Sequence, residues 1–305
     1  MNAVKLSPSL QPALLGVFTL AIGLLAAKPA HADRCKPNTS GAMVCTYQER
    51  TQSFSSAGLL GCLGGKGTRS VRWQVPEGTP PAGGWPVVFF YQGTVPASDP
   101  AYTPFTITRT AFGARYLQAS LHELLDDPAG TGKRYAVIAP EAAASLGLRF
   151  WDTNKLGTYA LKDDACFFPQ LFKDVSGGAY GAPSQFNMSK RFAYGISSGG
   201  YNTSRMAVSF NQDSNWAALA VVSASYATCA GPLCSVPSVL PSNHPPTKFY
   251  HGTADVIVPI GTMRTYFDRL SQQGIETEKV ENSGGHAFTA DVLGTSGIKA
   301  WFDRH

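Results

Sequence analysis

The stretch RFAYGISSGGYNTSRMAVSF, residues 191–210, joins an apolar run to a turn of glycines and serines and then to a segment with helical spacing. Residues 195–199 match the pattern Gly-x-Ser-x-Gly. Chance alone gives roughly a quarter of such a match in a chain this rich in glycine and serine, so the setting of the match must decide its meaning. A buried strand, a tight turn and a helix together form the setting of a nucleophile elbow.

Within this turn, Ser197 is the candidate nucleophile. An elbow holds its serine in a strained backbone conformation, and the small neighbours Gly195 and Gly199 avoid the clashes that this turn would otherwise cause. Ser198 lacks the first glycine of the pattern. We therefore predict that Ser197 attacks the substrate and that Ser198 gives its backbone N–H to an oxyanion hole.

A second oxyanion donor is expected at the end of the apolar run WPVVFFYQG, residues 85–93. The candidates are the backbone N–H groups of Gln92, Gly93 and Thr94, and Thr94 is preferred. A simple turn at the end of a strand is the alternative interpretation of these residues.

A serine nucleophile needs a base and an orienting carboxylate, which follow it in the order acid, then histidine, in this kind of fold. His286 lies in the glycine-flanked segment NSGGHAF after the last expected strand, and it is the predicted base. Asp255 ends the run KFYHGTAD, at the carboxyl-end position that active-site groups favour, and it is the predicted acid. His251 lies inside that run and is interpreted as structural. The other downstream residues are interpreted as loop, surface or terminal groups: His244, His305, Asp268 and Asp291.

Buried apolar runs alternate with helical segments along the chain, which predicts an α/β fold with a mostly parallel sheet covered on both faces. With the elbow, this pattern indicates the α/β-hydrolase fold. The expected strands are 70–76 (an edge strand), 85–93, 135–142, 192–197, 216–225, 247–255 and 275–283. Helices are expected at 115–127, 163–175 (where Pro169 is a possible interruption), about 201–210 and 262–274.

The first 32 residues have the three parts of a secretory signal: Lys5, an apolar run over 13–27, and the small-x-small site ending at Ala32. The run is short and interrupted for a membrane anchor, which is the competing interpretation. We predict cleavage after Ala32 and a secreted, extracellular protein. Residues 33–305 are then expected to form a single catalytic domain without a separate substrate-binding domain.

Charge and cysteine content bound the partners and the redox compartment. Residues 33–305 carry 23 basic and 20 acidic residues, which argues against nucleic acid or a membrane as the main partner, and no obligate protein partner is evident. All six cysteines follow the cleavage site, which predicts three disulfides. Fifteen pairings are possible, and short loops favour Cys35 with Cys45 and Cys229 with Cys234, leaving Cys62 for Cys166. A zinc site is the alternative, but the chain has no Cys-x-x-Cys or His-x-x-x-His pair to build it.

Three segments resemble the extracellular medium-chain-length polyhydroxyalkanoate depolymerases: YGISSGGYNTSRMA (194–207), FYHGTADVIVP (249–259) and SGGHAF (283–288). The resemblance covers roughly residues 85–300. It implies an α/β-hydrolase with Ser197, Asp255 and His286 as the triad, secretion, and hydrolysis of a bacterial storage polyester to hydroxyacid monomers or oligomers. FWDTN (150–154) and DDACFF (163–168) resemble a segment of the wider polyesterase and feruloyl esterase group. No cofactor or metal enters this chemistry.

An insoluble polyester must be held by apolar surface around the site. The segment 148–168 is expected to line the entrance, with Trp151 and Phe150 as predicted substrate contacts and Phe167 and Phe168 as further candidates. Burial of these rings in the core is the alternative.

Two other functions remain open from the sequence. One is a short-chain polyester depolymerase or a feruloyl or acetyl-xylan type carboxylesterase. The other is a binding protein that kept the fold without catalysis, against which the complete triad argues.

Overall fold

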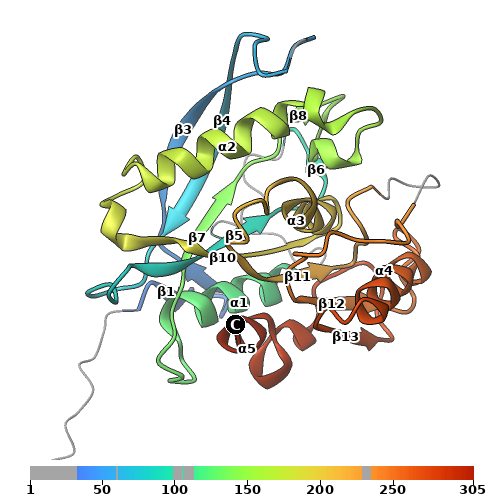
Figure 1. Ribbon diagram of the computed structural model, residues 1–305. Coiled ribbons are helices and arrows are strands. Elements are labelled where there is room, and N and C mark those ends of the chain that lie inside the picture. The colour runs from blue at the N-terminus through green and yellow to red at the C-terminus, as the bar shows by residue number, and fades with distance from the viewer. Residues whose placement is uncertain (1–32, 60, 99–104, 106–112, 229–234) are drawn as a thin grey trace, which may run out of the picture. The chain divides into compact units, whose positions relative to one another are not determined.

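The computed structural model describes residues 33–59, 61–98, 105, 113–228 and 235–305. Within these residues, eight strands form a central sheet in the order β13-β12-β11-β10-β5-β7-β4-β3 (Figure 1). Neighbouring strands from β13 to β7 are parallel, whereas β4 is antiparallel to both β7 and β3. The bounds are β3 Gln48–Ser55, β4 Lys66–Gln74, β5 Trp85–Tyr91, β7 Ala136–Pro140, β10 Phe186–Ile196, β11 Trp216–Val222, β12 Thr247–Gly252 and β13 Thr277–Asn282.

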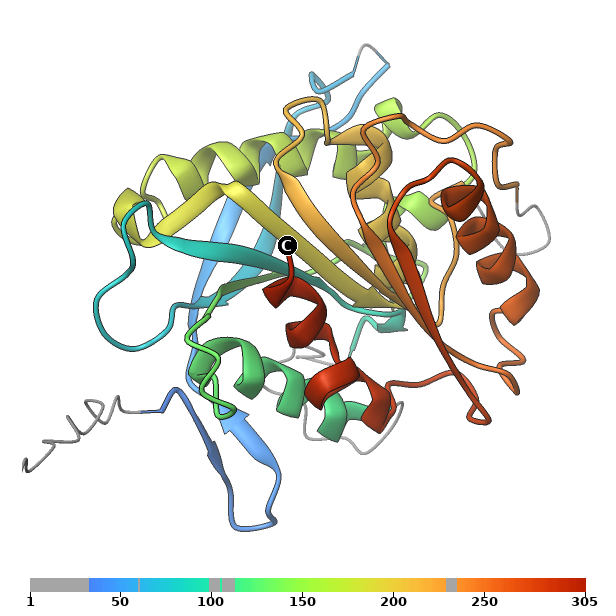
Figure 2. The same ribbon diagram turned by 60° about the horizontal axis from the view of Figure 1, so that its bottom comes forward.

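Helices cover both faces of this sheet because its central strands are apolar on both sides. Successive residues of β5 point to opposite faces. Phe90 joins a core with Leu121 of α1 (Ala114–Asp126) and Trp301 of α5 (Ile298–Asp303), and α1 and α5 lie on the same side of the sheet (Figure 2). Phe89 joins a second core with Leu171 of α2 (Asp163–Ser176). The predicted α/β fold with a mostly parallel, doubly covered sheet is confirmed. The remaining α-helices in the described chain are α3 (Ser198–Ser209) and α4 (Ile260–Gln272).

Two details of the expected elements differ in the structure. The strand expected at 70–76 as an edge strand is β4, and it lies inside the sheet because β3 pairs with it from Lys66 to Trp73. The sequence did not predict β3, because only Gln52 and Phe54 of its residues are buried and it therefore lacks an apolar run. Pro169 does not interrupt α2, which continues through it to Ser176.

Two disulfides tie the described chain together. Cys35 pairs with Cys45 between β1 (Cys35–Pro37) and β2 (Met43–Cys45), and Cys62 pairs with Cys166 on α2, both as expected. The expected Cys229–Cys234 bond and the expected signal segment 1–32 lie outside the described residues. The described residues between 33 and 305 belong to one compact unit, and none of their helices has the length and apolar character needed to cross a membrane.

Candidate active site

Ser197 lies at the junction between β10 and α3, with backbone angles φ 56° and ψ −123°. A residue other than glycine rarely adopts a positive φ, and such strain persists only where the surrounding structure enforces it. Here the N–H of Ser197 donates to the carbonyl of Val222 at the end of β11 (3.0 Å), and its carbonyl accepts from the N–H of Tyr201 (3.0 Å). The strand on one side and the helix on the other thus hold the serine in the conformation of a nucleophile elbow.

The glycines of the pattern are required by close packing. A Cβ atom on Gly195 would lie 2.5 Å from the carbonyl oxygen of Tyr91, and one on Gly199 would lie 1.9 Å from the same oxygen. Any side chain at either position would collide with the end of β5. The pattern around Ser197 is therefore a consequence of how tightly α3 approaches the sheet.

Asp255 follows β12 and has a side chain fully withdrawn from solvent. Its Oδ1 accepts from the backbone N–H groups of Ile257 and Val258, each at 2.9 Å. Its Oδ2 lies 2.8 Å from Nδ1 of His286. The turn that follows the strand thus fixes the carboxylate and leaves one oxygen to orient the imidazole, which is the role of the acid in a serine triad.

His286 reaches this carboxylate because the loops after β12 and β13 pack closely together. The N–H of Ala254 donates to the carbonyl of Gly284 (3.0 Å), and a Cβ atom on Gly252 would lie 2.1 Å from that same oxygen. The amide Oδ1 of Asn282 accepts from the N–H of Gly284 (2.8 Å) and shapes the loop. Strands β10, β11, β12 and β13 are parallel neighbours, so Ser197, Asp255 and His286 all follow the carboxyl ends of strands at one edge of the sheet.

The hydroxyl of Ser198 has a separate, structural task. Its Oγ accepts from the backbone N–H of Trp151 (3.0 Å) and donates to Oδ1 of Asn154 (2.7 Å). Both bonds hold this hydroxyl within the fold, which favours Ser197 over Ser198 as the nucleophile. Ser198 is the first residue of α3, so its own N–H is among the helix N–H groups that have no partner within the helix.

The loop after β5 passes beside the nucleophile. A Cβ atom on Gly93 would lie 3.5 Å from Cβ of Ser197, so the backbone of this residue is directly adjacent to the serine. Thr94 comes next and is exposed. Gln92 is turned inward, and its carbonyl accepts from the indole N–H of Trp151 at 2.9 Å. The expected oxyanion donors at Gly93 and Thr94 thus belong to the segment after β5 that lies beside Ser197. The third expected donor, Ser198, belongs to α3.

The prediction that Trp151 contacts substrate is wrong. Its side chain has no exposed surface, its N–H is bonded to Gln92, and its ring stacks on Phe168 with centroids 5.6 Å apart. A tryptophan can satisfy its one polar atom inside a core, and this one does so. Phe167 and Phe168 are also fully buried, whereas Phe150 is half-buried beneath the ammonium group of Lys155 (5.3 Å).

His251 contacts the acid, which the sequence did not reveal. Its Nε2 lies 2.8 Å from the carbonyl oxygen of Val258 and 3.3 Å from Oδ2 of Asp255. Burial lowers the pKa of His251, so the ring is neutral and donates from Nε2. Only the fold of the 255–258 turn brings the three groups together, and the spacing His251-x-x-x-Asp255 was the one available signal.

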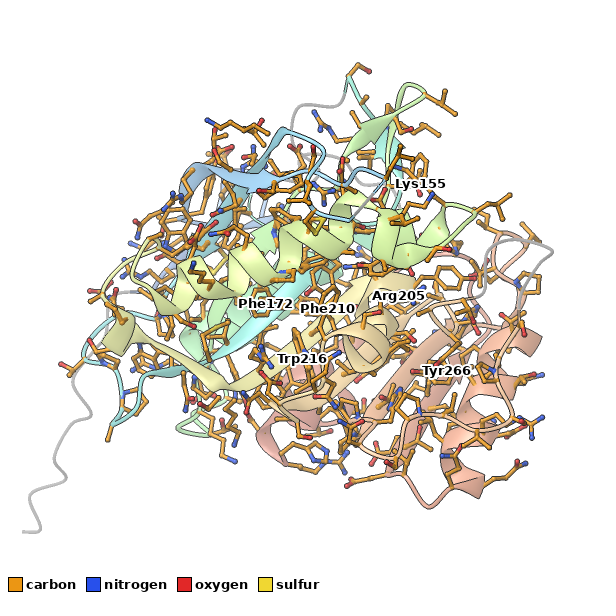
Figure 3. All side chains as sticks on the ribbon, turned by 45° about the horizontal axis from the view of Figure 1, so that its top comes forward. Lys155, Phe172, Arg205, Phe210, Trp216 and Tyr266 are labelled. Carbon is orange, nitrogen blue, oxygen red and sulfur yellow. A yellow bond between two sulfur atoms is a disulfide. The ribbon has the colours of Figure 1, made fainter. Side chains whose placement is uncertain are left out.

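Arg205 of α3 supports the segment from Trp151 to Tyr159 through polar contacts. Nε of Arg205 donates to Oγ1 of Thr153 (3.1 Å), and the same guanidinium donates to the carbonyl of Ala227 (2.8 Å) and lies over the ring of Tyr159 (4.3 Å) (Figure 3). Trp151 and Asn154, which bind Ser198, therefore lie on a segment that the buried Arg205 holds in place.

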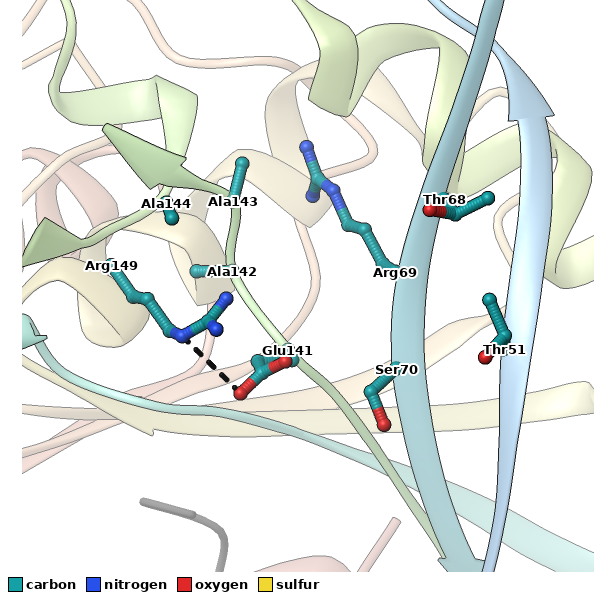
Figure 4. A pocket seen from close by; sticks show the side chains of 9 residues that line it. All are labelled: Thr51, Thr68, Arg69, Ser70, Glu141, Ala142, Ala143, Ala144 and Arg149. Atoms are coloured by element: carbon teal, nitrogen blue, oxygen red, sulfur yellow. Dashed lines mark ion pairs between the residues drawn. The ribbon is translucent and has the colours of Figure 1, made fainter. Parts of the chain in front are cut away.

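A polar cavity of about 450 Å³ opens at the same sheet edge, beside β7 and β4 (Figure 4). Arg149 and Glu141 form an ion pair across it (3.4 Å), and Arg69 is paired with buried Asp164 (2.5 Å). Each of these charged side chains thus has a partner of opposite charge. In the described part of the chain, no group of three or more His, Cys, Asp or Glu side chains is arranged to hold a metal ion.

Solved structures share this architecture. An esterase of Pyrobaculum calidifontis superposes with a TM-score of 0.51 at 12% identity, covering 87% of this chain and 85% of that one. A ferulic acid esterase superposes with a TM-score of 0.50 at 11% identity, covering 79% and 91%. No protein-family model matches the sequence. The fold is the α/β-hydrolase fold, and an elbow serine with a paired histidine and aspartate is the arrangement that serine hydrolases of this fold use.

A curated relative defines the family. Poly(3-hydroxyoctanoate) depolymerase of Pseudomonas fluorescens is 43% identical over 302 residues, covering 94% of this chain and 98% of that protein. The chain belongs to the polyhydroxyalkanoate depolymerase family, and it is a carboxylic ester hydrolase.

Proposed function

We propose that this chain is a secreted depolymerase that cleaves the ester bonds of medium-chain-length polyhydroxyalkanoate, of the polyhydroxyoctanoate type, through an acyl-enzyme on Ser197. The observation that carries the proposal is the strained serine at φ 56° on the same sheet edge as a His286–Asp255 pair joined at 2.8 Å. The choice of substrate rests on the relative, whose name states that it depolymerises poly(3-hydroxyoctanoate).

Each group has a defined part in the reaction. Oγ of Ser197 attacks the ester carbonyl carbon while Nε2 of His286 takes the hydroxyl proton, and Asp255 stabilises the resulting imidazolium through Nδ1–H. We assign binding of the oxyanion to the N–H of Ser198 and to those of Gly93 and Thr94. His286 then returns the proton to the departing alkoxide oxygen, which becomes the hydroxyl end of the shortened chain. Water, activated by the same imidazole, releases the acid end from Ser197.

Secretion is supported by two features. The disulfides Cys35–Cys45 and Cys62–Cys166 are typical of proteins that mature outside the reducing cytosol. Residues 1–32 have the composition of a cleavable signal.

A substrate panel tests the proposal. The purified enzyme should clear polyhydroxyoctanoate latex faster than polyhydroxybutyrate granules and should release little from feruloylated sugars or acetylated xylan. Ser197→Ala should abolish clearing, while Ser198→Ala, as the matched control, should keep the nucleophile and lose activity only in part. Preference for polyhydroxybutyrate or for a cell-wall ester would contradict the proposed substrate. Full activity in Ser197→Ala would contradict the mechanism.

A further inference from the structure

The turn between β8 (Ala144–Ser145) and β9 (Leu148–Arg149) contains a residue that is unfavourable for its backbone conformation. These strands pair as a hairpin, with Ser145 opposite Leu148, so the turn consists of Leu146 and Gly147. Both have positive φ, 52° and 77°, which is the requirement of a type I′ turn. Asn-Gly is the favoured pair there, because a branched apolar side chain is disfavoured at positive φ.

Leu146 is also 97% exposed, so its side chain gains almost nothing from the fold. The strained backbone of Leu146 therefore costs stability that burial of its side chain does not offset, and strain of this kind clusters at functional sites. A leucine at the tip of a hairpin therefore needs an explanation outside the packing of the chain.

The hairpin is linked to two segments that lie beside the catalytic serine. Strand β9 pairs with β6 (Val95–Pro96), which directly follows Thr94 of the loop beside Ser197. After β9 the chain reaches Trp151, whose N–H donates to Oγ of Ser198.

Other segments of the site carry exposed aliphatic side chains in the same way. Leu156 is 70% exposed and comes two residues after Asn154, the partner of Ser198. Val256 is 91% exposed and directly follows Asp255. We call these residues, which share attachment to a catalytic segment and exposure of an aliphatic side chain, the aliphatic rim: Leu146, Leu148, Leu156, Val256 and Ile257.

We propose that the aliphatic rim, with Leu146 at its tip, is the surface that binds the alkyl side chains of the insoluble polyester. The inference rests on the proposed function. A dissolved ester needs only the catalytic groups, whereas a polymer surface must be held by apolar area next to them. The rim supplies that area on the segments that carry or support Ser197, Asp255 and the oxyanion loop. It takes the role in substrate binding that the sequence had predicted for Trp151, which is buried.

Leu146→Asn should change polymer binding and protein stability in opposite directions. The variant creates the favoured Asn-Gly turn, so the melting temperature should rise by about 2 °C. Adsorption to polyhydroxyoctanoate latex, and clearing relative to hydrolysis of para-nitrophenyl butyrate, should both fall about tenfold, the scale expected for losing one buried leucine. A merely structural leucine would not produce this pair of results.

Val239→Asn is the matched control. Val239 is 75% exposed, and the N–H of its neighbour Leu240 donates to Gln273 after the last turn of α4, at the opposite edge of the sheet. This variant should keep the wild-type ratio of latex clearing to soluble hydrolysis.

The outcomes distinguish the rim from the proposed function. If wild-type enzyme clears latex and Leu146→Asn does so equally well, the rim inference is wrong and the depolymerase function stands. If Leu146→Asn instead converts a dimer to a monomer in size-exclusion chromatography, the leucine serves self-association, which also overturns the inference. If the wild-type enzyme hydrolyses soluble esters but does not clear or adsorb to latex, both proposals fail.

Discussion

Replacing Cys62 and Cys166 by alanine removes the disulfide that ties the loop between β3 and β4 to α2. The two cysteines are 104 residues apart, whereas Cys35 and Cys45 are 10 residues apart. In the chain-entropy model the long crosslink stabilises the fold by about 4.7 kcal/mol and the short one by about 2.8 kcal/mol, because the long loop restricts the unfolded chain more. Loss of the long disulfide should therefore cost about 2 kcal/mol more than loss of the short one.

Urea unfolding followed by circular dichroism measures both costs under the same conditions. The double variants Cys62→Ala/Cys166→Ala and Cys35→Ala/Cys45→Ala are compared with wild type, and each sample is first shown to be folded by its hydrolysis of a soluble ester. No cysteine takes part in the proposed mechanism, so the specific activity of the folded fraction should persist in both variants. An equal cost for the two disulfides, or a larger cost for the short one, would refute the entropic reasoning.

Three further predictions concern the site and the core. Gly199→Ala should destabilise the protein by about 3 kcal/mol or prevent folding, since its Cβ would lie 1.9 Å from the carbonyl oxygen of Tyr91; thermal unfolding measures this, and wild-type stability would contradict it. Burial lowers the pKa of His244 to about 4, so the contribution of this residue to stability is full above pH 6.5 and is lost as the pH falls from 6.5 to 4. Wild type should therefore lose about 3 kcal/mol more than His244→Gln in urea unfolding between pH 7.5 and 4, and equal losses would contradict the assignment. His286→Gln should lower kcat by at least about 10³, whereas His251→Gln should mainly lower the melting temperature; the reverse pattern in well-folded variants would contradict the choice of base.

The sequence predicted the sheet, and the positions of Ser197, Asp255 and His286 after its strands, because both depend on local patterns. Continuous apolar runs form strands buried on both faces, and glycines around Ser197 are imposed by the close approach of α3 to Tyr91. Asp255 and His286 follow consecutive parallel strands, so their meeting at one edge follows from the topology. Strand β3 escaped prediction because its residues are mostly exposed and polar.

The remaining errors come from contacts that no local pattern encodes. Trp151 is apolar with one donor, and whether such a ring lies in the core depends on the carbonyl of Gln92, 59 residues away. The contact between His251 and Asp255 depends on the carbonyl of Val258, which the turn folds back over the strand end. The strain at Leu146 is visible only in the backbone angles of the hairpin.

The central claim is that Ser197 forms the acyl-enzyme, and covalent labelling tests it most directly. The enzyme is inactivated with an organophosphate, digested, and the modified residue is located by mass spectrometry. We expect one phosphoryl group per chain, on Ser197, appearing in proportion to the loss of esterase activity. Labelling of Ser198, whose hydroxyl is bonded to Asn154 and to the N–H of Trp151, or an unlabelled enzyme that stays active, would contradict the account.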